Sequence, residues 1–235
     1  MKYKNELIET GFSILDNIYS DQEIDSMISS IENRTIRNEN HTKSTKLFAI
    51  RQLINTVPEL KKLLFSEKLI KLLYTIFNSE FFLTKAIYFD KPKESNWFVG
   101  YHQDLSISVK EKHEVKGYEN WTFKKGQFGV QPPTYILENT VTTRIHLDKT
   151  TSQNGALKII SNSHLDGIVR INSKNLNTDN EVICEVKKGG IMLMKPLLFH
   201  TSNRSDNSSQ RRVIHLEFSN LNLHKTLEYL EYKRF

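Results

Sequence analysis

The sequence predicts a mainly β protein with flanking helices, an α+β fold in which an N-terminal helical buttress supports a β-sandwich or barrel. Residues 1–80 carry apolar side chains at helical spacing, whereas residues 81–220 turn to short runs of β-forming residues separated by Gly, Pro, Asn and Ser. The chain has no Gly-rich turn between a strand and a helix, so a dinucleotide-binding fold or a P-loop has no support. At 235 residues without internal repeats, residues 1–235 are expected to form a single domain.

Three helices are expected in the N-terminal buttress. The first starts at Ser20 and Glu23, which have the spacing of a capping box, in which each side chain bonds the backbone of the other residue. The second is predicted over residues 46–56, because Pro58 disfavours helical backbone at the residue before it. The third starts near Ser66, where apolar side chains again recur every three to four residues.

Short strands are predicted where β-forming residues end at turn-forming ones. They cover residues 11–15, 83–90, 105–110, 141–147, 156–161, 182–187, 191–195 and 212–219. The insert at residues 110–138 is long and contains Trp121, Gln131 and several Gly and Pro residues. A segment of this kind is typical of a substrate lid, and the alternative is a packed surface loop anchored by its aromatic side chains.

Composition and charge narrow the class of protein. The chain is 38% hydrophobic and 26% charged, which indicates a folded globular protein rather than a disordered one. Its one cysteine, Cys184, rules out a disulfide scaffold and a cysteine-based structural zinc site. The chain lacks an apolar run of the ~18 residues that span a membrane, and its N-terminus lacks the apolar core of a secretory signal, so we expect a cytoplasmic protein without membrane contact.

The net charge of +6 bears on the binding partner. The basic residues are dispersed along the chain and form no concentrated stripe, so nucleic acid is not expected as a partner. A mild positive field favours small anionic molecules instead. We therefore expect a small-molecule substrate that carries a carboxylate or a phosphate, such as an amino acid or a natural-product intermediate.

Two His-x-Asp pairs are candidate metal ligands. On an extended segment, residues two apart point the same way, so His102 and Asp104 would converge on one point, and so would His146 and Asp148. With one more histidine, either pair would complete the 2-His-1-carboxylate face that leaves iron(II) with open positions. Position in the sequence alone does not decide which of the two pairs binds the metal. The alternative to a ligand role for His146 is that it is a polar residue pointing inward from a strand.

The second half of the chain supplies a further histidine and an arginine. His200 follows the predicted strand 191–195, and Arg211 stands eleven positions later, at the start of the next strand. A guanidinium at that place could lie beside the metal and bind a carboxylate through two parallel hydrogen bonds. Taken alone, His200 or Arg211 could be an ordinary surface side chain. A His-x-Asp pair followed in order by a histidine and an arginine is far less expected by chance.

These features together resemble the phytanoyl-CoA dioxygenase superfamily of iron(II)- and 2-oxoglutarate-dependent oxygenases. Residues 101–105, YHQDL, resemble its first metal motif, and His200 with Arg211 resembles its closing motif. Residues 154–164, NGALKIISNSH, resemble its N-G-x-L-x-x-x-P-G-S-H turn and strand, except that residues 161–162 are Ser-Asn in place of Pro-Gly.

The resemblance implies a double-stranded β-helix, a cupin-like jelly-roll barrel, with Fe(II), 2-oxoglutarate and O2 as its cofactors and cosubstrates. The family's metal pair lies well upstream of the N-G-x-L turn, which selects His102, Asp104 and His200 as ligands. It further implies that Arg211 binds the far carboxylate of 2-oxoglutarate and that Ser202 donates a hydroxyl to it. Candidate substrate contacts are Gln103, Trp121, Gln131 and Arg144.

The expected activity is that of a dioxygenase that hydroxylates an unactivated C–H bond of a small metabolite and releases succinate and CO2. Related halogenases lack the metal carboxylate, so the presence of Asp104 argues for hydroxylation. Two alternatives stay open at this point. One is a non-catalytic jelly roll that binds a metal or a small ligand, and the other is an oxygenase that acts on a macromolecule.

Overall fold

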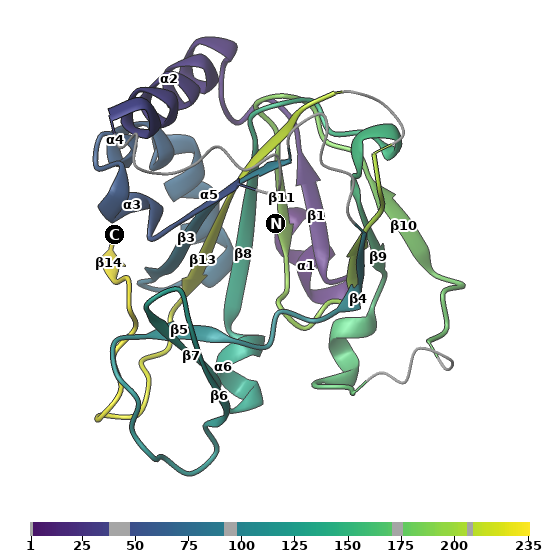
Figure 1. Ribbon diagram of the computed structural model, residues 1–235. Coiled ribbons are helices and arrows are strands. Elements are labelled where there is room, and N and C mark those ends of the chain that lie inside the picture. Colours follow the sequence, from purple (N-terminus) through teal and green to yellow (C-terminus); the bar gives the residue numbers. More distant parts are fainter. Residues whose placement is uncertain (1, 38–47, 92–97, 171–175, 206–208) are drawn as a thin grey trace.

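The computed structural model describes residues 2–37, 48–91, 98–170, 176–205 and 209–235. Two antiparallel sheets face each other as a sandwich (Figure 1). In order across the sheet, the larger one consists of β1 (Phe12–Leu15), β11 (Ile191–Met194), β8 (Thr140–His146), β13 (Arg211–Ser219), β3 (Phe82–Lys91) and β14 (Lys233–Arg234), with β2 (Phe48–Arg51) paired to β3. The smaller one consists of β10 (Glu181–Cys184), β9 (Leu157–Ile160), β12 (His200–Ser202) and β4 (Val99–His102).

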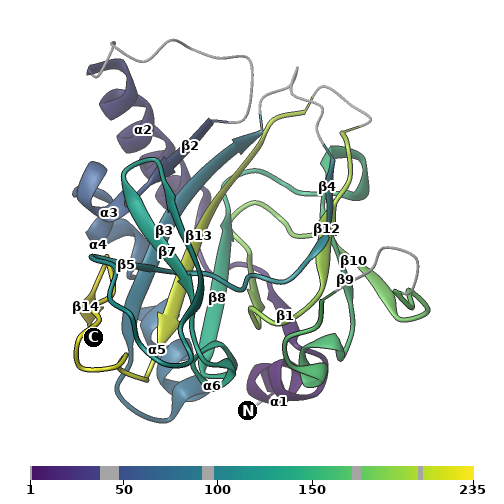
Figure 2. The same ribbon diagram turned by 60° about the horizontal axis from the view of Figure 1, so that its bottom comes forward.

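A third, three-stranded sheet projects beside β3 and β13 (Figure 2). It consists of β5 (Ile107–Val109), β7 (Gln127–Gln131) and β6 (Glu119–Lys124), and a short helix, α6 (Thr134–Glu138), follows it. The insert at residues 110–138 therefore contains the β6–β7 hairpin and α6, and its first part, residues 110–118, is irregular.

Helices cover the outer face of the larger sheet (Figure 1). They are α2 (Asp21–Arg37), α3 (Leu53–Thr56), α4 (Leu60–Leu64) and α5 (Glu67–Phe77), while α1 (Lys2–Glu9) packs near β1. Ile24 and Met27 of α2 and Leu73 of α5 are buried against outward side chains of the sheet such as Ile214. The predicted mainly β fold with a helical N-terminal buttress is confirmed.

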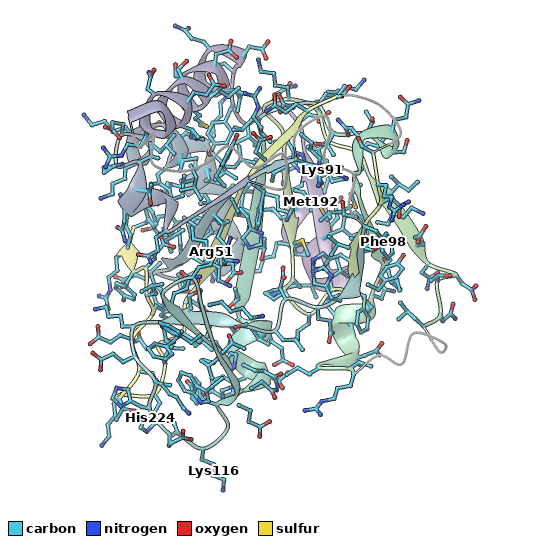
Figure 3. The ribbon with its side chains drawn as sticks, viewed as in Figure 1. Arg51, Lys91, Phe98, Lys116, Met192 and His224 are labelled. Atoms are coloured by element: carbon cyan, nitrogen blue, oxygen red, sulfur yellow. The ribbon has the colours of Figure 1, made fainter. Side chains whose placement is uncertain are left out.

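The space between the two sheets holds a second apolar cluster. Met192 of β11, labelled in Figure 3, is buried there with Met194 and with Leu157 and Ile159 of β9. Within the described ranges the two sheets share no hydrogen-bonded pair of strands, so the jelly roll is a sandwich rather than a closed barrel. The same ranges contain no helix that is long and apolar enough to cross a membrane.

Two of the three predicted helix starts are confirmed by their caps. The backbone N–H of Ser20 donates to Glu23 Oε2 at 2.7 Å, and the N–H of Glu23 donates to Ser20 Oγ at 3.3 Å. At α5 the N–H of Leu69 donates to Ser66 Oγ at 3.4 Å. In both cases a side chain satisfies backbone groups that the first helical turn leaves without partners.

The helix predicted over residues 46–56 is wrong in its first half. Residues 46 and 47 lie outside the described ranges, and Phe48–Arg51 forms β2, which pairs with β3. Gln52 has a φ of 49°, so the backbone turns there and α3 begins only at Leu53. The edge of β3 offers hydrogen bonds to an incoming strand, and this tertiary pairing outweighs the local helical pattern.

Candidate active site

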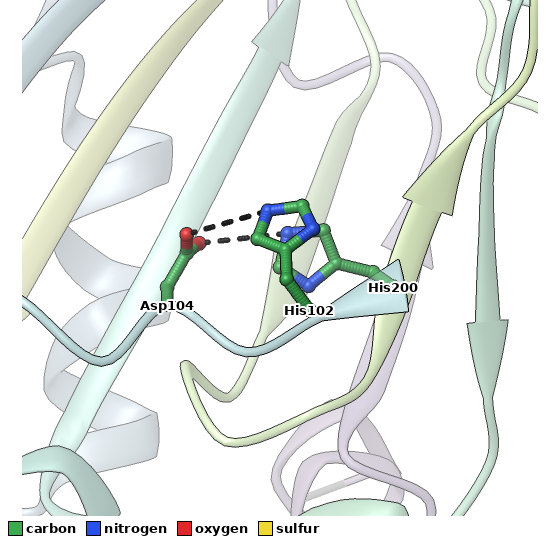
Figure 4. Close-up of side chains that lie close together, drawn as sticks. All are labelled: His102, Asp104 and His200. Carbon is green, nitrogen blue, oxygen red and sulfur yellow. Dashed lines mark ion pairs between the residues drawn. The ribbon is translucent and has the colours of Figure 1, made fainter. Parts of the chain in front are cut away.

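Three candidate ligands meet where β4, the edge strand of the smaller sheet, pairs with β12. His102 ends β4 and His200 begins β12, and the two residues are register partners on neighbouring strands. Asp104 lies two residues beyond β4, where its N–H donates to the carbonyl of Pro196 at 2.9 Å. Asp104 carboxylate oxygens lie 4.0 Å from His102 Nε2 and 3.7 Å from His200 Nε2 (Figure 4). One ligand atom from each residue lies within 4.8 Å of the others, so the three can share one metal ion.

Both histidines are oriented by the same local contact. The Nδ1–H of His102 donates to the carbonyl of Gly100, and the Nδ1–H of His200 donates to the carbonyl of Leu198, each at 2.9 Å and two residues back. Each ring therefore turns Nε2 toward Asp104 and the other histidine. A backbone partner of this kind fixes the tautomer of a metal-binding imidazole.

The charges at this point suit a metal cation. Burial lowers the pKa of His200 to about 4, so this imidazole is neutral at neutral pH, as a metal ligand must be. Burial raises the pKa of Asp104, but attraction to neighbouring groups, first to His200 in its acid, protonated form, outweighs burial and brings the pKa to about 2. The carboxylate is therefore ionised, and the group fits Fe(II), which binds two imidazoles and one carboxylate on one face.

The rival pair does not converge. His146 is buried, with Nδ1 2.7 Å from the hydroxyl of Thr150. Asp148 instead accepts hydrogen bonds from Arg212, from Nη2 at 2.8 Å and from Nε at 2.9 Å. Its carboxylate is thus occupied by an arginine on the outer side of the larger sheet, where Arg212 also contacts Glu32.

A cavity of about 210 Å³, here called the metal-side cavity, lies between the ligands and the larger sheet. Three cations line it: Arg211 from β13, Lys91 from β3 and Arg144 from β8. Arg211 and Lys91 are register partners, and the Nη2 of Arg211 lies 3.4 Å from the hydroxyl of Ser202. Arg211 and Ser202, both predicted from the sequence to bind the far carboxylate of 2-oxoglutarate, therefore line the same cavity, and their binding role stays a prediction.

The guanidinium of Arg211 lacks partners for part of its hydrogen-bonding capacity. Among the residues that the structure describes, its buried Nε and Nη1 find no hydrogen-bond partner, and the same holds for Nε of Arg144. Burial first, and then the charge of Arg144, lower the pKa of Arg211 to about 9, so it stays charged at neutral pH. A buried, charged guanidinium with unpaired N–H groups destabilises the folded protein unless an anion binds it. The metal-side cavity therefore fits a carboxylate beside the metal site.

A second cavity of about 390 Å³, the hairpin-side cavity, lies between β3, β13 and the β6–β7 hairpin. It shares Asp104, Phe89 and His215 with the metal-side cavity, so the two meet at the metal site. Gln131 lines it, as a predicted substrate contact would. Trp121 lines neither cavity and packs against the apolar cluster below the hairpin.

Gln103 also lines neither cavity. Its side-chain amide donates to the carbonyls of Leu197 at 2.6 Å and Gly167 at 2.8 Å, and its carbonyl oxygen accepts from the N–H of Val169 at 3.0 Å. The side chain lies between the two ligands in sequence but points toward these loops, and it holds the segment that carries His102 and Asp104.

We expect Gln103→Ala to lower the free energy of unfolding by about 2–4 kcal/mol, because it leaves three backbone groups without partners. Urea denaturation measures the change, with Gln22→Ala, an exposed position on α2, as the matched control. If Gln103→Ala left stability unchanged and weakened only substrate binding, the side chain would be a substrate contact, as the sequence suggested.

The Asn-Gly turn of residues 154 and 155 shapes the metal-side cavity. Asn154 accepts from the N–H of Thr151 at 2.7 Å and donates to the carbonyl of Lys149 at 2.8 Å. Gly155 has a φ of 83°, and an added Cβ would lie 3.0 Å from Lys91 Nζ. Glycine is therefore suited to position 155, because a side chain there would crowd the ammonium group of Lys91.

A second turn contains Asn162, which adopts a φ of 69°, a conformation that glycine favours. Asparagine therefore occupies a turn position where the family motif has glycine.

A family model for phytanoyl-CoA dioxygenase (PhyH) matches residues 8–213, which is most of the chain. The chain belongs to the phytanoyl-CoA dioxygenase family. The family predicted from the sequence is confirmed, and with it the general class of iron(II)- and 2-oxoglutarate-dependent enzyme. None of the curated proteins compared with the sequence matches it.

Solved structures share the fold of this phytanoyl-CoA dioxygenase family member. EctD from S. alaskensis, with 2-oxoglutarate and 5-hydroxyectoine, has a TM-score of 0.69 at 16% identity, over 93% of this chain and 75% of that chain. HygX from Streptomyces hygroscopicus, with nickel and 2-oxoglutarate, has 0.64 at 14%, over 93% and 86%. The epimerase SnoN from nogalamycin biosynthesis, described as α-ketoglutarate dependent, has 0.67 at 9%, over 93% and 79%. At these identities the likeness shows the fold alone.

Sequence reasoning missed several residues of the site of this family member. Lys91, which lines the metal-side cavity, lies one residue beyond the predicted strand 83–90. Lys85, His215 and Glu217, which line the hairpin-side cavity, lie within predicted strands that carried no predicted role for them. His215 accepts from Arg144 Nη1 at 3.4 Å and donates to Glu217 Oε1 at 3.1 Å, and Glu217 pairs with Lys85 at 2.8 Å. The available signal was the alternation in β13, since residues 211, 215 and 217 all point inward and are polar.

Proposed function

We propose that this protein is a dioxygenase that uses Fe(II), 2-oxoglutarate and O2 to hydroxylate an unactivated C–H bond of a small metabolite, with release of succinate and CO2. One observation carries the proposal: the His102–Asp104–His200 site adjoins a buried guanidinium, Arg211, whose Nε and Nη1 have no partner within the described part of the chain. Fe(II) with 2-oxoglutarate supplies the oxidation of the C–H bond. Binding of the metal and of 2-oxoglutarate depends on the residues of this chain.

The proposed metal ligands are His102, Asp104 and His200. The two imidazoles present Nε2 because their Nδ1–H groups are bonded to backbone carbonyls. Held by these three protein ligands, Fe(II) would keep open positions for 2-oxoglutarate and O2. The presence of Asp104 favours hydroxylation, because the carboxylate occupies the position that related halogenases leave for chloride.

The far carboxylate of 2-oxoglutarate is proposed to bind Arg211, with Ser202 donating its hydroxyl. Both line the metal-side cavity, and Lys91, the register partner of Arg211, adds a second positive charge there. Arg144 lies deeper on β8 and is held by His215, so it balances charge near Asp104. The net positive charge of this cavity suits a dianionic cosubstrate.

The test is to reconstitute the protein with Fe(II) and ascorbate and to follow the conversion of 2-oxoglutarate to succinate in the presence of O2. We expect slow uncoupled succinate formation that rises with the right metabolite, together with a product 16 Da heavier than that metabolite. Absence of succinate formation from protein that has bound Fe(II) would favour the non-catalytic alternative. A product of unchanged mass would instead favour epimerisation, the reaction named for SnoN.

The β6–β7 hairpin is proposed to cover the substrate. Shortening its tip by replacing residues 124–127 with Asn-Gly should change which metabolites stimulate turnover, while uncoupled succinate formation changes by less than about twofold. The reason is that the hairpin lines the hairpin-side cavity, and neither strand lines the metal-side cavity. Rates of both reactions over a metabolite panel provide the measurement. Equal losses in both would show that the segment only supports the fold.

A further inference from the structure

The hairpin-side cavity carries a charge imbalance that bears on the substrate. Its cations are Arg51, Lys85 and Lys124, and its carboxylates are Asp104 and Glu217. Lys85 Nζ lies 2.8 Å from Glu217 Oε1, and both groups are nearly buried, so this pair is balanced. Asp104 faces the two histidines of the metal site. Arg51 and Lys124 form no ion pair with a carboxylate in the described ranges, so two positive charges remain for a ligand.

The two cations come from different elements on the same cavity. Arg51 ends β2, at the edge of the larger sheet, and Lys124 ends β6, at the tip of the hairpin. Figure 3 shows Arg51 beside the hairpin tip, whereas Lys116, on the same insert, lies far from it. Both cations are exposed, as expected for groups at the mouth of a cavity.

One side of the neutral wall of the cavity offers hydrogen bonds, and the rest of that wall is apolar, formed by Ile87, Phe89, Leu105 and Phe128. Asn120 Nδ2 donates to Gln131 Oε1 at 2.9 Å, which leaves the carbonyl oxygen of Asn120 and the amide hydrogens of Gln131 for a ligand. At Gly129 an added Cβ would lie 2.8 Å from the hydroxyl oxygens of both Ser106 and Thr122. Glycine at this position therefore keeps two hydroxyls on the cavity wall.

We propose that the substrate is a hydroxyl-rich small molecule with one acidic group, a carboxylate or a phosphate; the proposal rests on the oxygenase function proposed above. The acidic group binds Arg51 and Lys124 at the mouth, and the hydroxyls face the hairpin. A purely apolar chain would leave the amides and hydroxyls of this wall unpaired. The cavity, at about 390 Å³, lies within the range of roughly 300–1,000 Å³ for small-molecule sites.

Isothermal titration of four probes into anaerobic protein loaded with Fe(II) and 2-oxoglutarate tests the proposal. The probes are D-glucose 6-phosphate, D-gluconate, D-glucose and hexanoate. We expect at least one of the first two to bind about tenfold or more tightly than the last two, and the preferred one identifies phosphate or carboxylate as the acidic group. Equal or tighter binding of hexanoate or glucose, or no binding of either acidic sugar, would overturn the proposal.

Variants of the two cations sharpen the test. Arg51→Gln and Lys124→Gln should each weaken binding of the acidic probe by about three- to tenfold, and less at high salt, because the charges are exposed. Lys116→Gln is the matched control and should leave binding unchanged. If neither cation variant weakens binding, the assignment is wrong. Loading is measured first by the visible Fe(II)–2-oxoglutarate absorption: failure to load contradicts the proposed function, whereas normal loading without probe selectivity contradicts only the substrate class.

Discussion

His200→Ala is expected to abolish 2-oxoglutarate turnover and to weaken Fe(II) binding by more than about a hundredfold, since loss of an outer contact to a metal ligand alone costs roughly 10–100-fold. His102→Ala and Asp104→Ala should do the same, because each removes one of three ligands on one face. Metal content after anaerobic reconstitution and desalting, together with succinate formation, measures both effects. We expect the fold to be retained, since none of the three side chains belongs to an apolar core cluster, and circular dichroism checks this.

The matched controls are the residues of the rival His-x-Asp pair. His146→Ala removes a contact to Thr150, and Asp148→Ala removes the partner of Arg212, so both variants should lose some stability. Both should still bind Fe(II), since neither side chain faces the metal site. Loss of metal from His146→Ala with retention by His102→Ala would mean that the wrong pair has been chosen.

Much of the site could be predicted because short sequence patterns carry it. Residues two apart on an extended segment share a face, which placed His102 and Asp104 together before any fold was known. The choice between the two pairs came from the family resemblance and not from spacing. The structure adds the physical reason: Asp148 lies where Arg212 binds it on the far side of the larger sheet, a contact between strands that local pattern does not contain.

Other elements depended on tertiary contacts. Strands β4 and β12 contain four and three residues, too short for an alternating pattern to be recognised, and they form because each pairs with a neighbour. The β6–β7 hairpin had a local signal in Lys125-Gly126, whose φ angles of 51° and 75° make a two-residue turn. The cluster of Lys85, His215 and Glu217 becomes visible only when β3 and β13 are placed side by side.

The alternation of β13 separates its first two residues into different roles. Arg211 points inward to the metal-side cavity, and Arg212 points outward to Asp148 and Glu32. Two adjacent arginines of the same strand therefore provide a variant and its matched control. An effect that depends only on removing a positive charge from this strand should appear in both Arg211→Ala and Arg212→Ala.

Arg211→Ala is expected to weaken 2-oxoglutarate binding by roughly ten- to more than a hundredfold, because a hydrogen bond to a charged group contributes about 1.5–3 kcal/mol. Arg211→Lys should recover only part of this affinity, since an ammonium lacks the two-pronged geometry of a guanidinium. Arg212→Ala should bind 2-oxoglutarate like the wild type while its thermal stability falls, because Asp148 loses a partner at 2.8 Å. Titration of 2-oxoglutarate into anaerobic, Fe(II)-loaded protein, followed by the metal-to-ligand charge-transfer band, gives the affinity directly. The assignment fails if Arg212→Ala is the variant that loses affinity and Arg211→Ala retains it.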